Sequence, residues 1–399
     1  MEPTVIPTVE PTPSPTEVSK FKLGNISDVT GPAAPALTVV DGALADLVKY
    51  FNDNNLIPGL EVEVEAYDSQ YNPANTKAAY EWLIERDADV IVTGLPPIID
   101  VVYPMCTEDE VALLTIACNA EAIVLPTWNF AFEVTTQSFM YTLMPWIEQN
   151  DPNFPTDRPA KIGGVGFAGN YAQYLQDSAK AYVDANPDKW EWIGGHILGW
   201  ETVTFGPEVD AMMDADYIIP PSTGFYIGSF IKEYRDAGGE ANFLGTDAHN
   251  AYMGLIVDAV GGWDAIDGML FALPNRWYNE DSEVTNLMNQ LLMDYHGASE
   301  AASMKKAGSS YQGAFHMWWG ILMLIQETAE QHGSDNVNSQ TIYDTATSFT
   351  LNMDGGQVLS FSETERTAWD YFGIYEASAA DEDLMRIGAD DWWPVRTEP

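Results

Sequence analysis

The stretch NISDVTGPAAPA, residues 25–36, joins a predicted strand to a predicted helix through a turn of small residues. The run FKLGNISDV, residues 21–29, is typical of a buried strand. The helix predicted over residues 37–52 carries one apolar face, which consists of Leu37, Val40, Leu44, Leu47, Val48 and Phe51. Strand-to-helix turns hold ligands in α/β proteins. This one has a single glycine and no lysine, which argues against a phosphate-binding loop.

The same unit recurs outward from this stretch. Strands are predicted at residues 60–68, 89–94, 112–118 and 130–134, and helices at 72–87 and from about 98. After the loop DPNFPTDRP the alternation of strands and helices begins again. Strands are predicted at 160–169, 192–199, 216–220 and 242–247, and helices at 171–186, 208–214 and 228–237. Long helices follow at 281–296 and 310–332, and hairpin-like strands at 351–361 and 370–378. This alternation predicts an α/β fold with doubly wound parallel sheets.

The charge of the chain excludes several kinds of partner. Sixty acidic residues against seventeen Lys and Arg give a net charge of −43. A surface of this sign repels nucleic acid and anionic membranes, and it is typical of a solvated acidic protein. The hydrophobic content of 46% over 399 residues is that of a globular protein with large cores. The longest apolar stretch, MWWGILMLI at residues 317–325, predicts a buried helix and is too short to span a membrane.

The N-terminal segment, residues 1–20, is rich in Pro and Thr and predicts a disordered tether. A tether behind a membrane anchor and an ordinary tail would have the same composition. We hypothesise that a precursor carries a signal peptide or lipoprotein signal ahead of it. The two cysteines, Cys106 and Cys118, form no metal or redox motif, and we expect both to be buried free thiols.

No catalytic, metal or cofactor motif stands out. GVGFAG, residues 164–169, has dinucleotide-binding spacing, but no strand ending in an acidic residue follows at the required distance. The five histidines form no metal-ligand pairing, and neither a nucleophile elbow nor a phosphate loop with lysine is present. A pair of carboxylates for hydrolysis stays open as an alternative, because so many acids always supply candidates.

The order of the motifs resembles the type I periplasmic binding proteins, in their branched-chain amino acid and amide receptor branch. The resemblance rests on the T-G-P-A-A turn, on LIPGLEVEVEAYDSQYNPA, on DADVIVTG and ALLTIACNA, and on RDAGGEANFLGTD and GAFHMWWG in the later part. It covers about residues 21–375. It implies two Rossmann-like lobes joined by three crossovers near residues 135–138, 272–275 and 363–369. The first lobe would comprise residues 21–136 and 275–365, and the second residues 137–274 and 366–399.

The resemblance also implies where a ligand would bind. In the first lobe the matching positions are Thr30, Ala36, Leu95, Pro96, Pro97, Cys118, Asn119 and Ala120. In the second lobe and the returning helix they are Tyr171, Thr223, Phe225, Asp247 and Trp318. Asp247 matches the acid that takes a ligand ammonium in amino acid receptors, although it could equally cap a helix. Asn119 could be a turn residue, Tyr171 a core aromatic, and only one of Trp318 and Trp319 could face the cleft.

The function implied is that of an extracytoplasmic solute-binding protein. It would deliver a small neutral or zwitterionic organic ligand, an amino acid, amide, amine or aromatic compound, to the permease of an ABC importer by hinge closure. Such a carrier needs no catalytic residue, metal or cofactor. We expect a monomer that meets the membrane only through an N-terminal anchor and binds no nucleic acid. The alternatives are a ligand-sensing domain of the same fold and an acid-rich carboxylate hydrolase.

Overall fold

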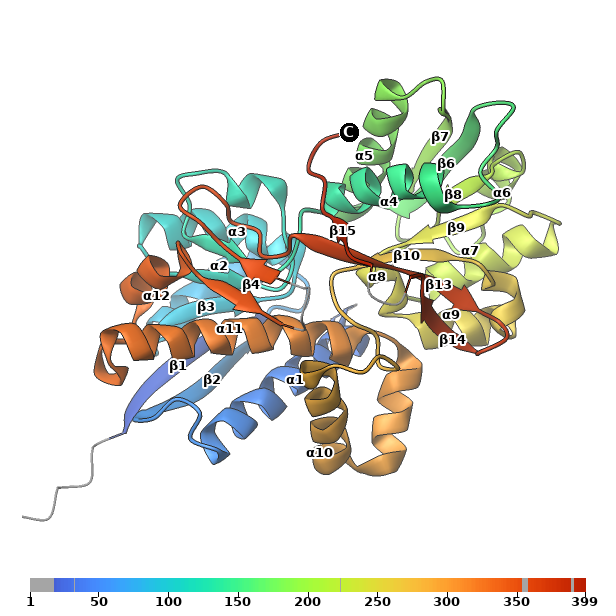
Figure 1. The fold of residues 1–399 in the computed structure, drawn as a ribbon. Helices are drawn as coiled ribbons and strands as arrows, with labels where there is room; N and C mark the ends of the chain where they lie inside the picture. Colours follow the sequence, from blue (N-terminus) through green and yellow to red (C-terminus); the bar gives the residue numbers. More distant parts are fainter. Residues whose placement is uncertain (1–17, 32, 223, 354–357, 389–390) are drawn as a thin grey trace, which may run out of the picture.

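The computed structural model describes residues 18–31, 33–222, 224–353, 358–388 and 391–399, and it forms two α/β lobes side by side (Figure 1). The first lobe holds a parallel sheet in the order β2-β1-β3-β4-β5. Its strands are β1 (Ser19–Ser27), β2 (Leu60–Asp68), β3 (Val90–Thr93), β4 (Leu113–Thr115) and β5 (Asn129–Ala131). β1 therefore begins within the segment expected to be a tether, at Ser19, whereas residues 1–17 lie outside the described part of the chain.

Helices cover the first sheet as the apolar patterns predict. They are α1 (Ala34–Asp53), α2 (Pro73–Ile84), α3 (Pro96–Glu108) and the short 3-10 helix η1 (Ala120–Ile123). The predicted face of α1 is buried from Leu44 to Phe51, while the side chain of Asn72 caps α2 by accepting the N–H of Ala74 at 3.0 Å. Pro73 follows at the first helical position, where its missing N–H costs nothing.

The second lobe is a mixed sheet in the order β14-β13-β10-β9-β8-β6-β7. Five of its strands run parallel to one another. They are β6 (Ala160–Phe167), β7 (Trp190–Leu198), β8 (Tyr217–Ile219), β9 (Asn242–Gly245) and β10 (Leu270–Leu273). β13 (Tyr371–Ser378) adds antiparallel to β10, and β14 (Asp383–Arg386) and β15 (Trp393–Pro394) pair with β13. The sequence pattern predicted neither β10 nor the last two short strands.

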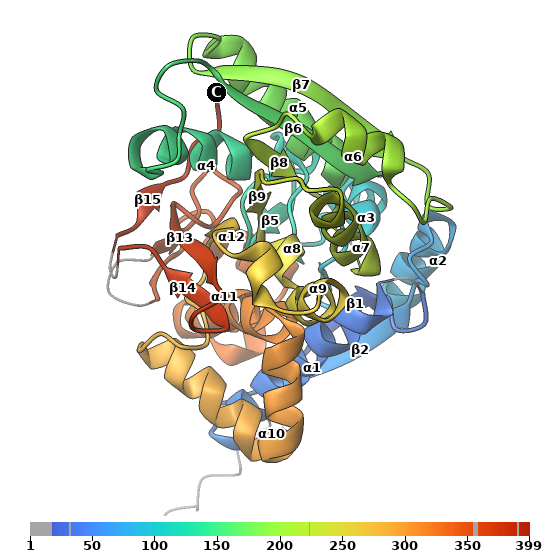
Figure 2. The same ribbon diagram turned by 90° about the vertical axis from the view of Figure 1, so that its right-hand side faces the viewer.

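The helices of the second lobe connect these strands along the chain and pack outside the sheet (Figure 2). They are α4 (Thr136–Asn150), α5 (Asn170–Ala185), α6 (Gly206–Met212), α7 (Gly224–Asp236), α8 (Asp247–Asn250), α9 (Met253–Val260) and η2 (Trp263–Ile266). The expected α/β class, with two lobes built on parallel strands, is confirmed. GVGFAG belongs to β6 and the turn after it, where Gly164 and Gly166 leave room for the side chain of Gln176 rather than for a nucleotide.

The chain returns to the first lobe after β10. The returning elements are α10 (Glu283–Ala307), α11 (Ser310–His332), η3 (Ser334–Asn336), α12 (Ser339–Ala346) and the hairpin of β11 (Thr350–Asn352) and β12 (Val358–Ser360). α11 packs along α1 and contains the apolar stretch that was predicted to be a buried helix. The helix predicted at 281–296 continues to Ala307 through a kink at Gly297, whose φ of +74° suits glycine.

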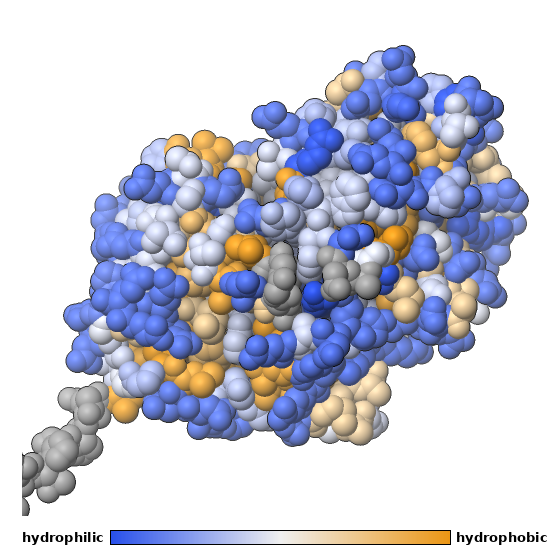
Figure 3. Space-filling view, viewed as in Figure 1, coloured by the Kyte–Doolittle hydropathy of each residue, from blue (hydrophilic) through white to orange (hydrophobic). Residues whose placement is uncertain are grey.

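The surface is that of a highly charged protein. Hydrophilic residues cover most of the face seen in Figure 3. Among the residues described, no helix is both long and apolar enough to cross a membrane. Cys106 and Cys118 are both buried and free, as expected, and burial raises the pKa of each thiol.

Candidate functional site

A cavity of about 690 Å³ lies between the lobes, and we call it the interlobe cavity. Residues that follow strands of both sheets line it, together with the start of α1 and of α11. They are Ala33, Ala36, Leu37, Val40, Tyr71, Gly94, Leu95, Pro96, Ile116, Ala117, Cys118, Glu133, Val134, Thr136, Phe139, Tyr171, Trp200, Ser222, Gly224, Tyr226, Asp247, Ala248, Asn250, Ala251, Tyr252, Leu273, Pro274, Asn275, Ser309, Ser310, Gln312, Gly313, Ala314 and Met317. This is the edge at which open α/β sheets bind ligands.

The first-lobe edge of the cavity is held by Asp28, which is fully buried. Its carboxylate accepts the N–H of Gly31 at 2.5 Å and the N–H of Ala33 at 2.8 Å. These bonds fix the turn that leads into α1 and satisfy the N–H of its N-cap residue, Ala33. The small side chains of Ala33 and Ala36 then leave space in the cavity wall.

The second-lobe edge carries Asp247 at the start of α8, directly after β9. The hydroxyl of Tyr171 lies 2.6 Å from the Thr246 hydroxyl and donates to Asp247 Oδ1 at 3.5 Å. Asp247 keeps part of its surface open, but that surface faces the cavity rather than bulk water. Burial raises its pKa against the opposing hydrogen bonds from Ala248 N–H and Tyr171.

His249 is buried beneath the same edge and does not line the cavity. Its Nδ1 accepts the N–H of Thr246 at 3.1 Å, so its Nε2 carries the proton and donates to the Pro220 carbonyl at 3.0 Å. Burial lowers the pKa of this histidine to about 4, and it is neutral near pH 7. The imidazole thus ties the ends of β8 and β9 together without adding charge.

Glu133 enters the cavity two residues after β5 and is only 4% exposed. Its Oε1 accepts the N–H of Val134 at 2.7 Å, whereas its Oε2 is buried without a hydrogen-bond partner. Burial raises the pKa of Glu133, and the negative charge of Asp247 raises it further. Two carboxylates from opposite lobes therefore share one cavity, and no described residue that lines it is Lys, Arg or His.

Aromatic and amide groups complete the lining. Tyr71, Tyr252 and the half-exposed Trp200 contribute aromatic surface. Asn250 is fully buried and neither of its side-chain polar atoms has a partner, and Asn275 Oδ1 is likewise unpaired. Buried amides without partners are costly in a finished fold, so these groups are available to a ligand.

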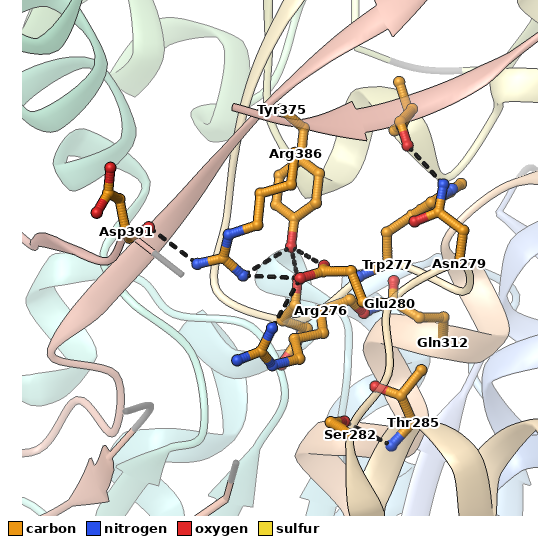
Figure 4. Close-up of polar contacts among 12 residues, drawn as sticks. Arg276, Trp277, Asn279, Glu280, Ser282, Thr285, Gln312, Tyr375, Arg386 and Asp391 are labelled. Carbon is orange, nitrogen blue, oxygen red and sulfur yellow. Dashed lines mark hydrogen bonds and ion pairs between the residues drawn. The ribbon is translucent and has the colours of Figure 1, made fainter. Parts of the chain in front are cut away.

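A buried ionic cluster connects the cavity with the segment that leaves β10 (Figure 4). Glu280 Oε2 accepts from Arg276 at 2.9 Å and from Arg386 at 3.0 Å, and its other oxygen accepts from the hydroxyl of Tyr375. Gln312, which lines the cavity, donates to the Arg276 carbonyl at 2.5 Å. The cluster joins β13, β14 and the chain between β10 and α10, where the polypeptide passes from one lobe to the other.

Six of the residues predicted for the site line the cavity. They are Ala36, Leu95, Pro96, Cys118, Tyr171 and Asp247. Thr223 lies outside the described residues, as does the side chain of Phe225, whose backbone belongs to α7. Whether any of these residues contacts a ligand stays a prediction.

The structure does not bring Thr30, Pro97, Asn119, Ala120 or Trp318 to the cavity wall. Thr30 is exposed and its hydroxyl donates to Asp68 at 2.5 Å. Asn119 uses its amide donor for the Pro96 carbonyl and for Asp100.

Neither tryptophan of α11 lines the cavity. Trp318 is fully buried toward α1, where its Nε1 donates to the Val40 carbonyl at 3.1 Å, and Trp319 packs on Phe51. The first two turns of α11 form the cavity face instead, through Ser310, Gln312, Gly313, Ala314 and Met317.

The sequence-based prediction missed Glu133, Asn250 and Asn275. Glu133 stands at the end of the apolar run FAFEV. A charged residue where a buried parallel strand ends is expensive unless it has a task, and this would have been the signal. Among the described residues, no group of three or more His, Cys, Asp or Glu is arranged to hold a metal ion.

These features define a two-lobed solute-binding protein, and comparisons with known proteins support that class. The family model described as periplasmic binding protein matches residues 20–380. The chain therefore belongs to the periplasmic binding protein family, a family of extracytoplasmic binding proteins rather than enzymes. No curated protein sequence matches the chain.

Solved structures of low sequence identity share the fold. A branched-chain amino acid ABC transporter protein from Thermus thermophilus with bound valine superposes with a TM-score of 0.80 at 16% identity, over 95% of this chain and 97% of that chain. A solute-binding protein of an ABC transporter from Rhodopseudomonas palustris BisB5, in complex with 3,4-dihydroxybenzoic acid, gives 0.75 at 16%, over 95% and 99%. A fatty acid ABC transporter substrate-binding protein from Thermomonospora curvata gives 0.77 at 14%, over 95% and 93%. The expected type I periplasmic binding protein fold is confirmed.

Proposed function

We propose that the protein binds one small organic solute in the interlobe cavity and delivers it to the permease of an ABC importer. The observation that carries the proposal is the cavity itself, which residues of both lobes enclose and where buried polar atoms of Glu133, Asn250 and Asn275 lack partners. A site formed by two lobes is completed when they close, so that ligand binding and lobe closure are coupled. The three linking segments near residues 135–138, 272–275 and 363–369 would serve as the hinge.

The volume and lining limit the solute class. About 690 Å³ of mostly apolar space suits a compact organic molecule. The absence of Lys, Arg and His among the described lining residues disfavours a polyanion. An amino acid, amide, amine or aromatic compound remains, and the valine and 3,4-dihydroxybenzoic acid bound in two structures of the same fold belong to this range.

A thermal-shift screen of amino acids, amides, amines, aromatic acids and nucleotides tests the proposal. Any solute that binds only the folded protein raises the melting temperature by mass action. We expect at least one compact organic solute to raise it, by several degrees at saturating concentration. A shift produced by a nucleotide alone, with none from the organic solutes, would refute the carrier function.

The importer partnership has a separate test. Genes for a permease and an ATPase are expected beside the gene for this protein. A kinase or amidase operon in that place would instead favour a ligand-sensing role for the same fold.

A further inference from the structure

Within the interlobe cavity, the charge distribution is one-sided. Glu133 and Asp247 supply two carboxylates from opposite lobes, and the described lining contains no cationic side chain to neutralise them. Two further acids, Glu365 and Glu121, act with Glu133 on the buried thiol of Cys118, which also lines the cavity. His249, beside Asp247, is neutral. The described lining of the cavity therefore carries two acidic groups and no basic one, and burial raises the pKa of each acid.

Glu133 has no role in the fold that would account for the cost of burying its carboxylate. One of its oxygens accepts a single backbone N–H, from the residue that follows it. The other oxygen is buried and has no hydrogen-bond partner, and the residue itself lines the cavity. A buried carboxylate without donors is unfavourable unless a partner arrives. The missing partner is a donor that a ligand brings.

The same edge of the cavity is unsuited to a ligand carboxylate. Pro96 has no N–H to offer, and both N–H groups of the Asn119 amide are used within the first lobe. A carboxylate placed here would meet Glu133 rather than a donor. The ammonium group of an α-amino acid in this orientation would therefore strengthen binding, and its carboxylate would weaken binding.

The remaining walls fit a cation with organic substituents. Tyr71, Tyr171, Tyr252 and Trp200 line the cavity, and the faces of aromatic rings attract cations. The unpartnered amide of Asn250 can hold one further polar group. Charge, donors and aromatic surface thus agree on one ligand class.

We propose, on the basis of the solute-binding function above, that the ligand is a small organic amine that carries a positive charge and no carboxylate, with its ammonium held between Glu133 and Asp247. Glu133 would then be the residue that separates amines from amino acids in this protein. Asp247 alone would accept the ammonium of either ligand class.

Two matched sets of compounds test this inference by calorimetric titration. One set is 2-phenylethylamine, L-phenylalanine, 3-phenylpropanamide and 3-phenylpropanoate, and the other is 3-methylbutylamine, L-leucine, 4-methylpentanamide and 4-methylpentanoate. Size and shape are nearly constant within a set, so that affinity reports charge. We expect the amine of at least one set to bind at least tenfold more tightly than its three analogues.

Variants separate the role of Glu133 from a general loss of folding. Glu133→Gln should weaken amine binding at least tenfold while leaving the melting temperature of the empty protein unchanged or higher. Glu191→Gln, on the exposed face of β7, is the matched control and should change neither.

Three results would overturn the inference. The first is that a carboxylate-bearing analogue binds as tightly as the amine or more tightly. The second is that Glu133→Gln changes the affinity for the amine by less than twofold. The third is that neither set binds while an uncharged or anionic solute binds in the broader screen. The third result would leave the proposed solute-binding function intact. If no solute of any class binds, both proposals fail.

Discussion

Glu133 and Asp247 reach the same cavity from different sheets, and the charge of Asp247 raises the pKa of Glu133. The pair costs the empty protein stability and has no protein cation to offset it. Functional sites commonly keep such destabilising arrangements, because the ligand supplies what the fold lacks.

Asp247→Asn should weaken binding of the best ammonium-bearing solute by roughly tenfold to hundredfold. A charge-assisted hydrogen bond contributes about 1.5–3 kcal/mol, and this change removes the charge at nearly constant shape. Titration calorimetry measures the effect, and Asp188→Asn on an exposed loop serves as the control. Unchanged affinity in Asp247→Asn would reduce this residue to a helix cap.

Glu133→Gln should stabilise the empty protein near pH 7.5 but not near pH 4. The pKa of Glu133 is raised above its ordinary value of 4.5, so below that value the group is protonated in both states and costs nothing. As the pH rises from 4.5 to the folded-state pKa, Glu133 ionises in the unfolded chain but stays protonated in the folded protein. The folded state therefore loses stability over this range. The facing groups, Asp247, the Tyr171 hydroxyl and the Cys118 thiol, carry no positive charge that could reverse the sign. Melting curves of both proteins at the two pH values decide the matter, and an equal difference at both would contradict the assignment.

His249 should be neutral at pH 6.5, with its proton on Nε2, while His296 should be protonated to a greater extent. Burial lowers the pKa of His249 to about 4, whereas hydrogen bonds to Asp46 and Glu300 raise that of His296 despite its desolvation. Nitrogen-detected NMR distinguishes the two states in one spectrum. Because the pKa of His249 is lowered on folding, about 3 kcal/mol of stability should be lost as the pH falls from 6.5 toward 4. A doubly protonated His249 at pH 6.5 would contradict the hydrogen bond in which its Nδ1 accepts the N–H of Thr246.

Glu280→Gln should lower the stability of the protein by about 3–5 kcal/mol, because it leaves two buried arginines without their carboxylate. The side chains of Glu280 and Arg386 are only 11% and 4% exposed. Asp236→Asn breaks the exposed pair with Lys232 and should cost at most about 0.5 kcal/mol. Urea unfolding of both variants provides the comparison, and similar midpoints would show that the cluster is not a structural support.

The elements with a strong apolar period could be predicted from the sequence, because burial of one face dictates them. The buried face of α1, the strands from β1 to β9 and the apolar part of α11 are of this kind. β14 and β15 could not be predicted, since they are short and exist only through pairing with β13. The length of α10 was also missed, because a glycine at position 297 indicates an end rather than a kink.

The candidate site was only partly predictable. Asp247 and Tyr171 stand next to strand ends, where sequence position alone points to the ligand edge. The direction in which Trp318 points from α11 depends on its contact with Val40. Helical periodicity alone does not show which face of an apolar run is directed toward the cavity. The isolation of Glu133 Oε2 is a property of three-dimensional packing and has no local signal beyond the charge itself.

The central claim is that the interlobe cavity holds the solute, and a pair of glycine variants tests it most directly. Gly313 and Gly42 both lie in helices and both have room for a side chain, but only Gly313 lines the cavity. A Cβ at position 313 would lie 3.9 Å from Asn275 Nδ2, whereas one at position 42 would have no atom within 4 Å. Titration of the strongest solute from the screen should show at least a tenfold loss of affinity in Gly313→Leu and wild-type affinity in Gly42→Leu. Wild-type affinity in Gly313→Leu would place the ligand elsewhere and contradict the account.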